Sequence, residues 1–238
     1  MEYFDVSRKH NPYDRLLTEE EIRLGLHRDF VGGMWDELGR LQIEFLKRQG
    51  LLPAHSLLDM GCGALRGGVR FIDYLNSGLY CGLDMNESLL EAGRYELERA
   101  CLSGKHPVLL ADDSFAVDRF GRHFDYVMAQ SVFTHVPMNH IVQCLVKVRD
   151  VLKPGCEFFA TFFEAPHPAF LGPLTHEPGG VTTYFDRDPF HYSLAEFEWM
   201  AKQAGMALRY IGDWEHPRNQ KMLGFKSADM TRGAAVHL

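Results

Sequence analysis

The feature that most constrains this chain is a glycine-rich turn that directly follows an apolar run. The segment from Leu57 to Gly68 reads LLDMGCGALRGG, in which apolar residues end at Asp59, glycines follow and a helical pattern begins. This order predicts a buried strand, a tight turn and a helix N-terminus. In α/β sheets such a turn usually binds a nucleotide-like ligand, because the N–H groups at the helix start face it.

Length and composition narrow the class of protein. With 238 residues, 46% of them hydrophobic, the chain can form one α/β domain with additions and a sizeable core. No apolar run approaches the ~20 residues that span a bilayer, and the N-terminus has no signal-peptide pattern, so we expect a cytoplasmic protein with no membrane partner. A net charge of −7 without a basic stripe argues against nucleic acid as a partner.

The five cysteines and twelve histidines form no recognisable metal or redox motif. The cysteine count is odd and no pair has redox or metal-ligand spacing, so we expect reduced, buried thiols rather than disulfides. No His-Glu-x-x-His sequence or helical histidine pair is present, and we therefore expect no metal.

From residue 55 onward, strand-like runs alternate with helical patterns. Seven strands are predicted, at 55–60, 79–84, 107–111, 124–129, 156–163, 206–214 and 220–226. Helices are predicted at 66–76, from Asn86 to Leu102, at 137–152, and from a capping box at Ser193 to Gly205. This alternation predicts an α/β, Rossmann-like, seven-stranded mixed sheet, mostly parallel with an antiparallel terminal hairpin, and with helices on both faces.

Two segments stand outside this alternation. Thr18-Glu19-Glu20-Glu21 fits a capping box, Gly32-Gly33 breaks the first helix, and a second helix ends near Gly50, which predicts a helical cap on the sheet edge. Residues 164–192 hold five of the eleven prolines, and such a long irregular connection is typical of a lid or binding loop. The expected organisation is an arm and helical cap (1–54), a core domain (55–226) with the insert 164–192, and a C-terminal tail (227–238).

Two ligand classes compete for the glycine turn. A dinucleotide fingerprint needs glycine at the position that Arg66 occupies, which disfavours close approach of a pyrophosphate. Asp59, before the first glycine, can instead anchor the loop or hold the amino group of a cationic ligand.

Five motifs in order resemble those of class I S-adenosylmethionine-dependent methyltransferases with a type 11/12 core, over roughly residues 55–226. They are Leu58–Gly63, Gly82–Asp84, Ala111–Phe115, Phe124–Val127 with Ser131–Val136, and Val151–Cys156. Each motif is weak alone, but five at suitable spacing are specific. The resemblance implies S-adenosyl-L-methionine as cofactor and methyl transfer to a small-molecule acceptor.

The resemblance also implies cofactor contacts. Asp84 would hold the ribose hydroxyls, although helix capping is an equal alternative, and Met85 would pack on the adenine. Either Asp112 or Asp113 would accept from the adenine amino group, with a slight preference for Asp113, and Arg66 either reaches the methionine carboxylate or is a surface residue. The expected cofactor set is Asp59, Gly61, Gly63, Arg66, Asp84, Met85, Asp112, Asp113 and Gln130.

The sequence indicates fewer residues for binding the methyl acceptor than for binding the cofactor. His135, after the fourth strand, and Glu164, at the end of the fifth, are the candidate catalytic bases, each with a structural role as the alternative. The expected substrate-site residues are Arg28, Trp35, His167, Tyr184 and His191. They favour a polar acceptor, such as a sugar or hydroxylated metabolite, and O-methylation over N-methylation. A nicotinamide-dependent oxidoreductase and a non-catalytic S-adenosylmethionine-binding protein stay as alternatives, and a homo-oligomer stays open.

Overall fold

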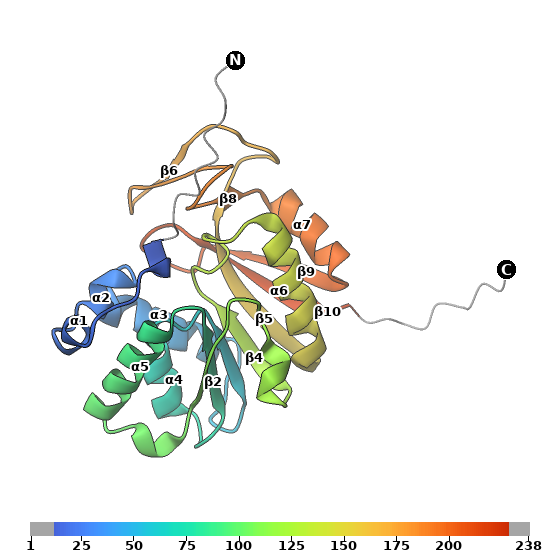
Figure 1. The fold of residues 1–238 in the computed structure, drawn as a ribbon. Coiled ribbons are helices and arrows are strands. Elements are labelled where there is room, and N and C mark those ends of the chain that lie inside the picture. Colours follow the sequence, from blue (N-terminus) through green and yellow to red (C-terminus); the bar gives the residue numbers. More distant parts are fainter. Residues whose placement is uncertain (1–11, 229–238) are drawn as a thin grey trace.

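An eight-stranded sheet forms the centre of residues 12–228, the part of the chain that the computed structural model describes (Figure 1). Its main path has the order β3-β2-β1-β4-β5-β10-β9, and β8 pairs with β5 beside this path. The sheet strands are β1 (Leu57–Met60), β2 (Tyr80–Asp84), β3 (Val108–Ala111), β4 (Phe124–Ala129), β5 (Leu152–Glu164), β8 (His191–Tyr192), β9 (Met206–Gly212) and β10 (Lys221–Ser227). Strands β1 to β5 pair in parallel, whereas β10 is antiparallel to β5 and β9. The predicted mixed Rossmann-like sheet is therefore confirmed, with β8 as an extra strand.

Helices cover both faces of this sheet. They are α1 (Glu19–Arg23), α2 (His27–Phe30), α3 (Trp35–Arg48), α4 (Gly68–Tyr74), α5 (Glu87–Arg99), α6 (Met138–Val151) and α7 (Leu194–Gln203), with short 3-10 helices at Pro12–Asp14, Ser103–Lys105 and Val117–Phe120. Residues from α3, α4 and α5 share one buried cluster, and residues from α6 and α7 share another (Figure 1).

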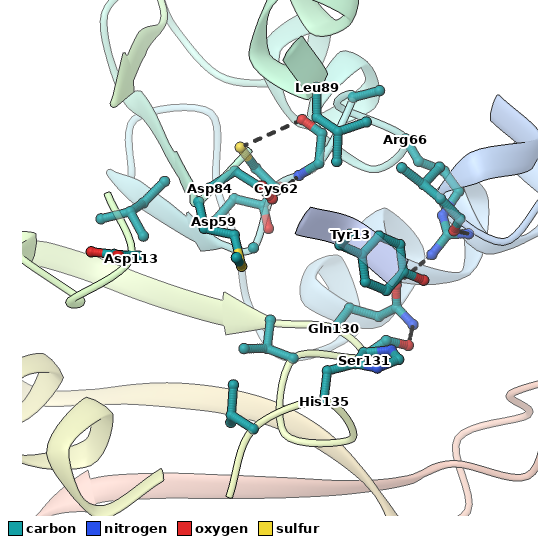
Figure 2. A pocket seen from close by; sticks show the side chains of 18 of the residues that line it. Tyr13, Asp59, Cys62, Arg66, Asp84, Leu89, Asp113, Gln130, Ser131 and His135 are labelled. Atoms are coloured by element: carbon teal, nitrogen blue, oxygen red, sulfur yellow. Dashed lines mark hydrogen bonds between the residues drawn. The ribbon is translucent and has the colours of Figure 1, made fainter. Parts of the chain in front are cut away.

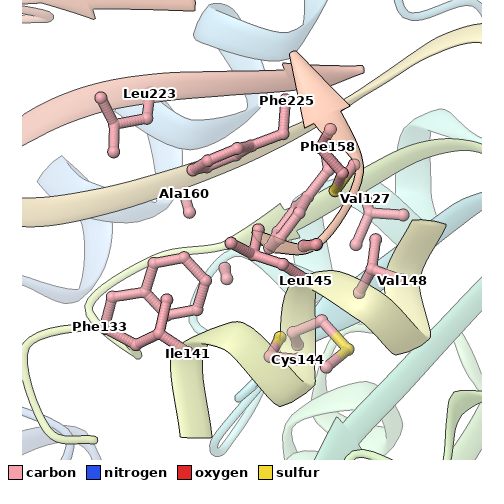
Figure 3. Close-up of a cluster of buried hydrophobic side chains, with 14 of the residues drawn as sticks. Val127, Phe133, Ile141, Cys144, Leu145, Val148, Phe158, Ala160, Leu223 and Phe225 are labelled. Carbon is pink, nitrogen blue, oxygen red and sulfur yellow. The ribbon is translucent and has the colours of Figure 1, made fainter. Parts of the chain in front are cut away.

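The central strands are apolar on both faces because each face is covered. Phe158 of β5 packs with Leu145 and Val148 of α6, as Figure 3 shows, whereas its neighbour Phe159 belongs to the cluster on the opposite face, with Phe45 of α3. Successive strand residues point to opposite faces, so consecutive phenylalanines stabilise two separate helical layers.

Local sequence signals explain several element boundaries. Thr18 accepts a hydrogen bond from the Glu21 N–H while the Glu21 side chain accepts from Thr18, so the predicted capping box is confirmed. The helix it starts is shorter than expected, because Gly25 has a φ of +80° and divides it into α1 and α2. Asn86 caps α5 by accepting from the Ser88 and Leu89 N–H groups.

Other boundaries differ from the sequence prediction. Helix α4 begins only at Gly68, two residues later than predicted, because Leu65 still has a positive φ in the turn. Strand β5 begins at Leu152, which pairs with Phe124, rather than at residue 156.

The insert contains more regular structure than its composition indicates. Strands β6 (Leu174–His176) and β7 (Val181–Thr183) form an antiparallel hairpin, and β8 extends the main sheet beside the end of β5. The insert is thereby attached to the core next to the cavity described below. The predicted N-terminal arm falls almost entirely outside the described residues, as does most of the predicted C-terminal tail.

Candidate functional site

A cavity of about 450 Å³ opens where β1, β2, β3 and β4 end (Figure 2). In parallel sheets this edge is the usual place for a ligand. All nine residues of the expected cofactor set line the cavity, and so does His135. The structure thus brings together residues of four of the five motifs, whereas no residue of Val151–Cys156 lines the cavity.

The backbone conformation and packing of the turn after β1 require glycine at positions 61 and 63. Gly61 and Gly63 have φ angles of +64° and +53°, which favour glycine. A Cβ on Gly61 would lie 2.5 Å from a Val132 methyl group, and one on Gly63 would lie 3.3 Å from a Val31 methyl group. Local geometry and packing therefore account for both glycines before any ligand is considered.

Asp84 is held in place by backbone donors. Its two carboxylate oxygens accept from the N–H groups of Gly63 at 2.8 Å and Asn86 at 2.9 Å. Burial raises the pKa of Asp84 above its ordinary value, although these N–H groups oppose the rise. Because each carboxylate oxygen has two lone pairs, this oriented side chain can still accept two further hydrogen bonds.

Asp59 lines the same cavity, but fewer hydrogen bonds hold its carboxylate in place. Among the described residues, only the Tyr80 hydroxyl donates to its carboxylate, at 2.7 Å. Burial, with a contribution from the nearby Asp84 charge, raises the pKa of Asp59 to about 7. A ligand cation beside Asp59 would therefore favour its ionised form.

Arg66 is a buried cation without a carboxylate partner among residues 12–228. One of its terminal nitrogens donates to the carbonyls of Val31 and Gly33, and the other donates to Gln130 Oε1 at 2.8 Å. Burial lowers the pKa of Arg66 to about 10, and the group stays charged at neutral pH. Its remaining N–H donors are available to an anionic ligand in the cavity, which Arg66 lines (Figure 2).

Gln130 supports Arg66 and makes several other contacts. Its carbonyl oxygen accepts from Arg66 and, at 3.3 Å, from Gln42, while its amide nitrogen donates to the Ser131 hydroxyl. Ser131 in turn donates to Gln220 of the β9–β10 connection. Gln130 thus lines the cavity mainly as part of a buried network that orients Arg66.

Asp112 and Asp113 lie in different environments. Asp112 accepts from the N–H groups of Ser114 and Ala116, both at 2.8 Å. Burial raises its pKa, but these hydrogen bonds outweigh that effect and hold the pKa below its ordinary value. Asp113 is exposed, lines the cavity and has no hydrogen-bond partner within the described residues. Of the two, Asp113 is the carboxylate that a ligand can engage without breaking existing bonds.

The other end of the cavity is formed by distant segments. His135 is 24% exposed, and its ring meets the Tyr13 ring edge-on at a centroid distance of 5.0 Å. The Tyr13 carbonyl accepts from Asn86 Nδ2 at 2.8 Å, which attaches the N-terminal segment to the start of α5, and the Tyr13 side chain lies beside Arg66 and Gln130 (Figure 2). His135 Nδ1 lies 2.6 Å from Asp188 Oδ1, and no described residue hydrogen bonds to Nε2.

The structure places the second candidate base and the expected substrate residues away from the cavity lining. Glu164 accepts from the Tyr210 hydroxyl at 2.7 Å. Arg28 forms two hydrogen bonds with Glu96 of α5 and stacks on Trp35, so both lie in the contact between the cap and the core.

The three insert residues also have local roles. His191 contacts the Thr183 hydroxyl and the Phe170 carbonyl inside the insert. Tyr184 stacks with Arg187, and His167 is exposed. None of them lines the cavity.

Four residues around the site were missed by sequence reasoning: Tyr13, Gln42, His140 and Asp188. The first three line the cavity, and Asp188 contacts His135. No motif or spacing marks them. Tyr13, Gln42 and Asp188 reach the site through long-range folding, and His140 is the third residue of α6.

Metal and thiol chemistry find no support in the described part of the chain. It contains no group of three or more His, Cys, Asp or Glu side chains that could hold a metal ion. Burial raises the pKa of Cys62, a cavity-lining thiol, well above its ordinary value, so it is protonated at neutral pH. No helix within residues 12–228 is long and apolar enough to cross a membrane.

Part of this chain is similar in sequence to a methyltransferase domain, and its fold is similar to those of solved methyltransferases. Residues 58–158 match the family model of a methyltransferase domain. An S-adenosylmethionine-dependent methyltransferase from Clostridium acetobutylicum has a similar fold, at 11% identity, covering 87% of this chain and 98% of that chain, with a TM-score of 0.63. The CcbJ methyltransferase from Streptomyces caelestis matches at 18% identity, covering 80% and 89% respectively, with a TM-score of 0.60. Magnesium protoporphyrin IX methyltransferase from Synechocystis, solved with bound S-adenosylmethionine, matches at 13% identity, covering 90% and 87%, with a TM-score of 0.58.

Proposed function

We propose that this chain is an S-adenosylmethionine-dependent methyltransferase that methylates a hydroxyl group of a small polar acceptor, such as a sugar or hydroxylated metabolite. The observation that carries the proposal is one cavity with two different ends. One end holds oriented carboxylates and the buried Arg66, and the other holds His135 with an available Nε2.

The residues at the first end fit the methyl donor. S-Adenosylmethionine, when bound, supplies a methyl group on a positively charged sulfur. Arg66 would hold the methionine carboxylate, and Asp59 would hold the amino group. The carboxylate of Asp84 would accept from the ribose hydroxyls and that of Asp113 from the adenine amino group, with Met85 packing on the ring. Arg66 supports this assignment, because its buried guanidinium donates only to neutral carbonyl oxygens among the described residues and has no carboxylate partner there.

His135 is the proposed general base. Its Nε2 would take the hydroxyl proton as the acceptor oxygen attacks, since a hydroxyl is a weak nucleophile while it keeps that proton. Tyr13 would cover the site and exclude water, and alignment of the two reactants supplies much of the rate enhancement, up to about 7–11 kcal/mol.

The preference for oxygen depends on this base. Solved structures of the same fold include an N-methyltransferase and a putative O-methyltransferase, so the fold leaves the acceptor atom open. A neutral amine can attack with its lone pair and lose a proton afterwards, whereas a hydroxyl benefits from a base during attack. A histidine in the cavity therefore favours a hydroxyl acceptor.

Two measurements test the proposal. Isothermal titration calorimetry with S-adenosylmethionine and with NAD should detect binding of the first only, and no binding of S-adenosylmethionine would contradict the proposed donor. A screen of hydroxylated and amine metabolites, read out as S-adenosylhomocysteine release, should then give turnover with hydroxyl compounds. Turnover with amines alone would contradict O-methylation.

A further inference from the structure

A carboxylate from the insert lies directly against the proposed base. Asp188 Oδ1 is 2.6 Å from His135 Nδ1, although 53 residues separate them in the chain. Both side chains are largely buried, with 24% exposure for His135 and 21% for Asp188. This contact joins the core, which provides the histidine, to the insert, which provides the acid.

Two further hydrogen bonds, both accepted by backbone carbonyls of the core, fix the insert beside His135 independently of this contact. The Phe190 N–H donates to the Thr134 carbonyl at 2.7 Å, and the Tyr192 hydroxyl donates to the Val136 carbonyl at 3.0 Å. The residues on both sides of His135 are thus bonded to the segment that follows Asp188. The position of the carboxylate is therefore set by the fold rather than by a flexible surface ion pair.

The geometry also determines which imidazole nitrogen is free. An ionised carboxylate can only accept hydrogen bonds, so Nδ1 is the donor in this contact, and in the neutral form of the ring Nε2 then keeps its lone pair. The second oxygen, Asp188 Oδ2, is buried and has no hydrogen-bond partner among the described residues. Among the described residues, the His135 ring is therefore the hydrogen-bond partner of the Asp188 carboxylate.

We infer that Asp188 is a positioning residue for His135. The core then provides the general base, and the insert provides the carboxylate that orients it. The inference rests on the proposed function of His135. In the step it serves, the acceptor oxygen bonds to the methyl carbon, the carbon–sulfur bond breaks with its electron pair left on sulfur, and the hydroxyl proton moves to His135 Nε2. Asp188 holds the tautomer that can accept this proton and stabilises the imidazolium that results.

The first test reads the tautomer directly and needs no acceptor. Nitrogen-15 NMR of the histidine-labelled protein, with the His135 signals assigned from His135→Gln, should show neutral His135 with the proton on Nδ1. In Asp188→Leu, which has no acceptor for that proton, the proton should move in large part to Nε2. Asp186→Leu is the matched control, since Asp186 lies in the same segment, is 61% exposed and pairs only with the adjacent Arg187.

The second test measures turnover with the best hydroxyl compound from the acceptor screen. Asp188→Asn should lower kcat at least about 100-fold with the affinity for S-adenosylmethionine within about twofold, because the carboxylate acts on the base and lies outside the donor end. Asp188→Glu should recover part of the loss by restoring the charge, and Asp186→Asn should match the wild type.

The outcomes separate the two proposals. An Nε2-protonated His135 in the wild type, or an unchanged tautomer in Asp188→Leu with folding intact by circular dichroism, would overturn the role of Asp188 whatever the enzyme methylates. A normal tautomer shift in a protein that fails to bind S-adenosylmethionine would instead contradict the proposed function and leave the Asp188–His135 pair established.

Discussion

The two ends of the cavity are built in different ways. Asp59, Asp84 and Asp113 lie at or directly after the ends of three neighbouring parallel strands, and all fall within about 55 residues of sequence. The opposite end combines Tyr13 from the N-terminal segment, His135 after β4 and Asp188 from the insert, which span more than 170 residues.

Under the proposed function, this difference explains how one fold can bind the same methyl donor in different proteins while the methyl acceptor varies. At the donor end, the sheet itself positions Asp84 through backbone N–H groups, so changes in distant loops leave it in place. At the acceptor end, position depends on contacts between loops, and an altered insert would change the site without disturbing the sheet. If the two ends are independent, a substitution at one end should change either kcat or the affinity for S-adenosylmethionine, but not both.

The largest effect is expected on kcat, from a substitution at the acceptor end of the cavity, which holds His135. His135→Gln removes the proposed base and should lower kcat by about 10²- to 10⁴-fold, the usual contribution of general-base catalysis. The affinity for S-adenosylmethionine, measured by calorimetry, should stay within about twofold. His167→Gln, an exposed histidine of the insert, is the control and should leave both quantities unchanged. A large loss of donor affinity in His135→Gln would show that the two ends are not independent.

The reverse pattern is expected for Asp84→Ala. It removes the acceptor of two backbone N–H groups and of the proposed ribose contacts, so the Kd for S-adenosylmethionine should rise about 100-fold, equivalent to about 3 kcal/mol of charged hydrogen bonds. The melting temperature should also fall, because the Gly63 and Asn86 N–H groups lose their partner. Asp73→Ala, an exposed carboxylate on α4, should change neither measurement. Donor affinity within threefold of the wild type would contradict the role of Asp84.

A smaller effect is expected for Arg66→Met. Loss of the guanidinium removes the proposed contact to the methionine carboxylate, and the KM for S-adenosylmethionine should rise about 10- to 30-fold. Arg66→Lys keeps the charge without the planar donor arrangement, so its KM should fall between those of Arg66→Met and the wild type. Equal values for the two variants would argue that Arg66 serves only the carbonyls of Val31 and Gly33.

The contrast between the two ends also explains what the sequence could predict. The fold and the donor end depend on local patterns: strand periodicity, turn glycines and acids at strand ends, which lie close together because parallel strands end at one edge. His135 was predicted as a candidate for the same reason, since it lies in the loop that follows β4.

The acceptor end contains no such local signal. Tyr13 reaches the cavity, and Asp188 reaches His135, only through tertiary contacts. Asp188 is also one of three consecutive charged residues, Asp186-Arg187-Asp188, among which the sequence alone cannot choose. Unusual composition was a misleading guide here: Arg28 and Trp35 serve cap packing, and His191 holds the insert together.

The smallest expected change in the affinity for S-adenosylmethionine is its dependence on pH, through the ionisation of Asp59. Asp59 has a pKa of about 7 in the folded protein against 3.8 for the isolated side chain, because burial disfavours its charge. Between about pH 4 and 7 the folded protein therefore binds more protons than the unfolded chain. The stability of the ligand-free protein should accordingly fall as the pH rises through this range, by about 4 kcal/mol from this group.

Binding of S-adenosylmethionine should have the opposite dependence. Its amino group needs the ionised form of Asp59, so affinity should rise with pH and level off above about 7, with the Kd at pH 6 about tenfold higher than at pH 8. Calorimetric titrations at both values, at constant ionic strength, measure the ratio. Asp59→Asn keeps an acceptor for the Tyr80 hydroxyl but cannot ionise, so its affinity should be lower and nearly independent of pH. A tenfold ratio that persists in Asp59→Asn would assign the titration to another group and leave the donor amino group without its proposed partner.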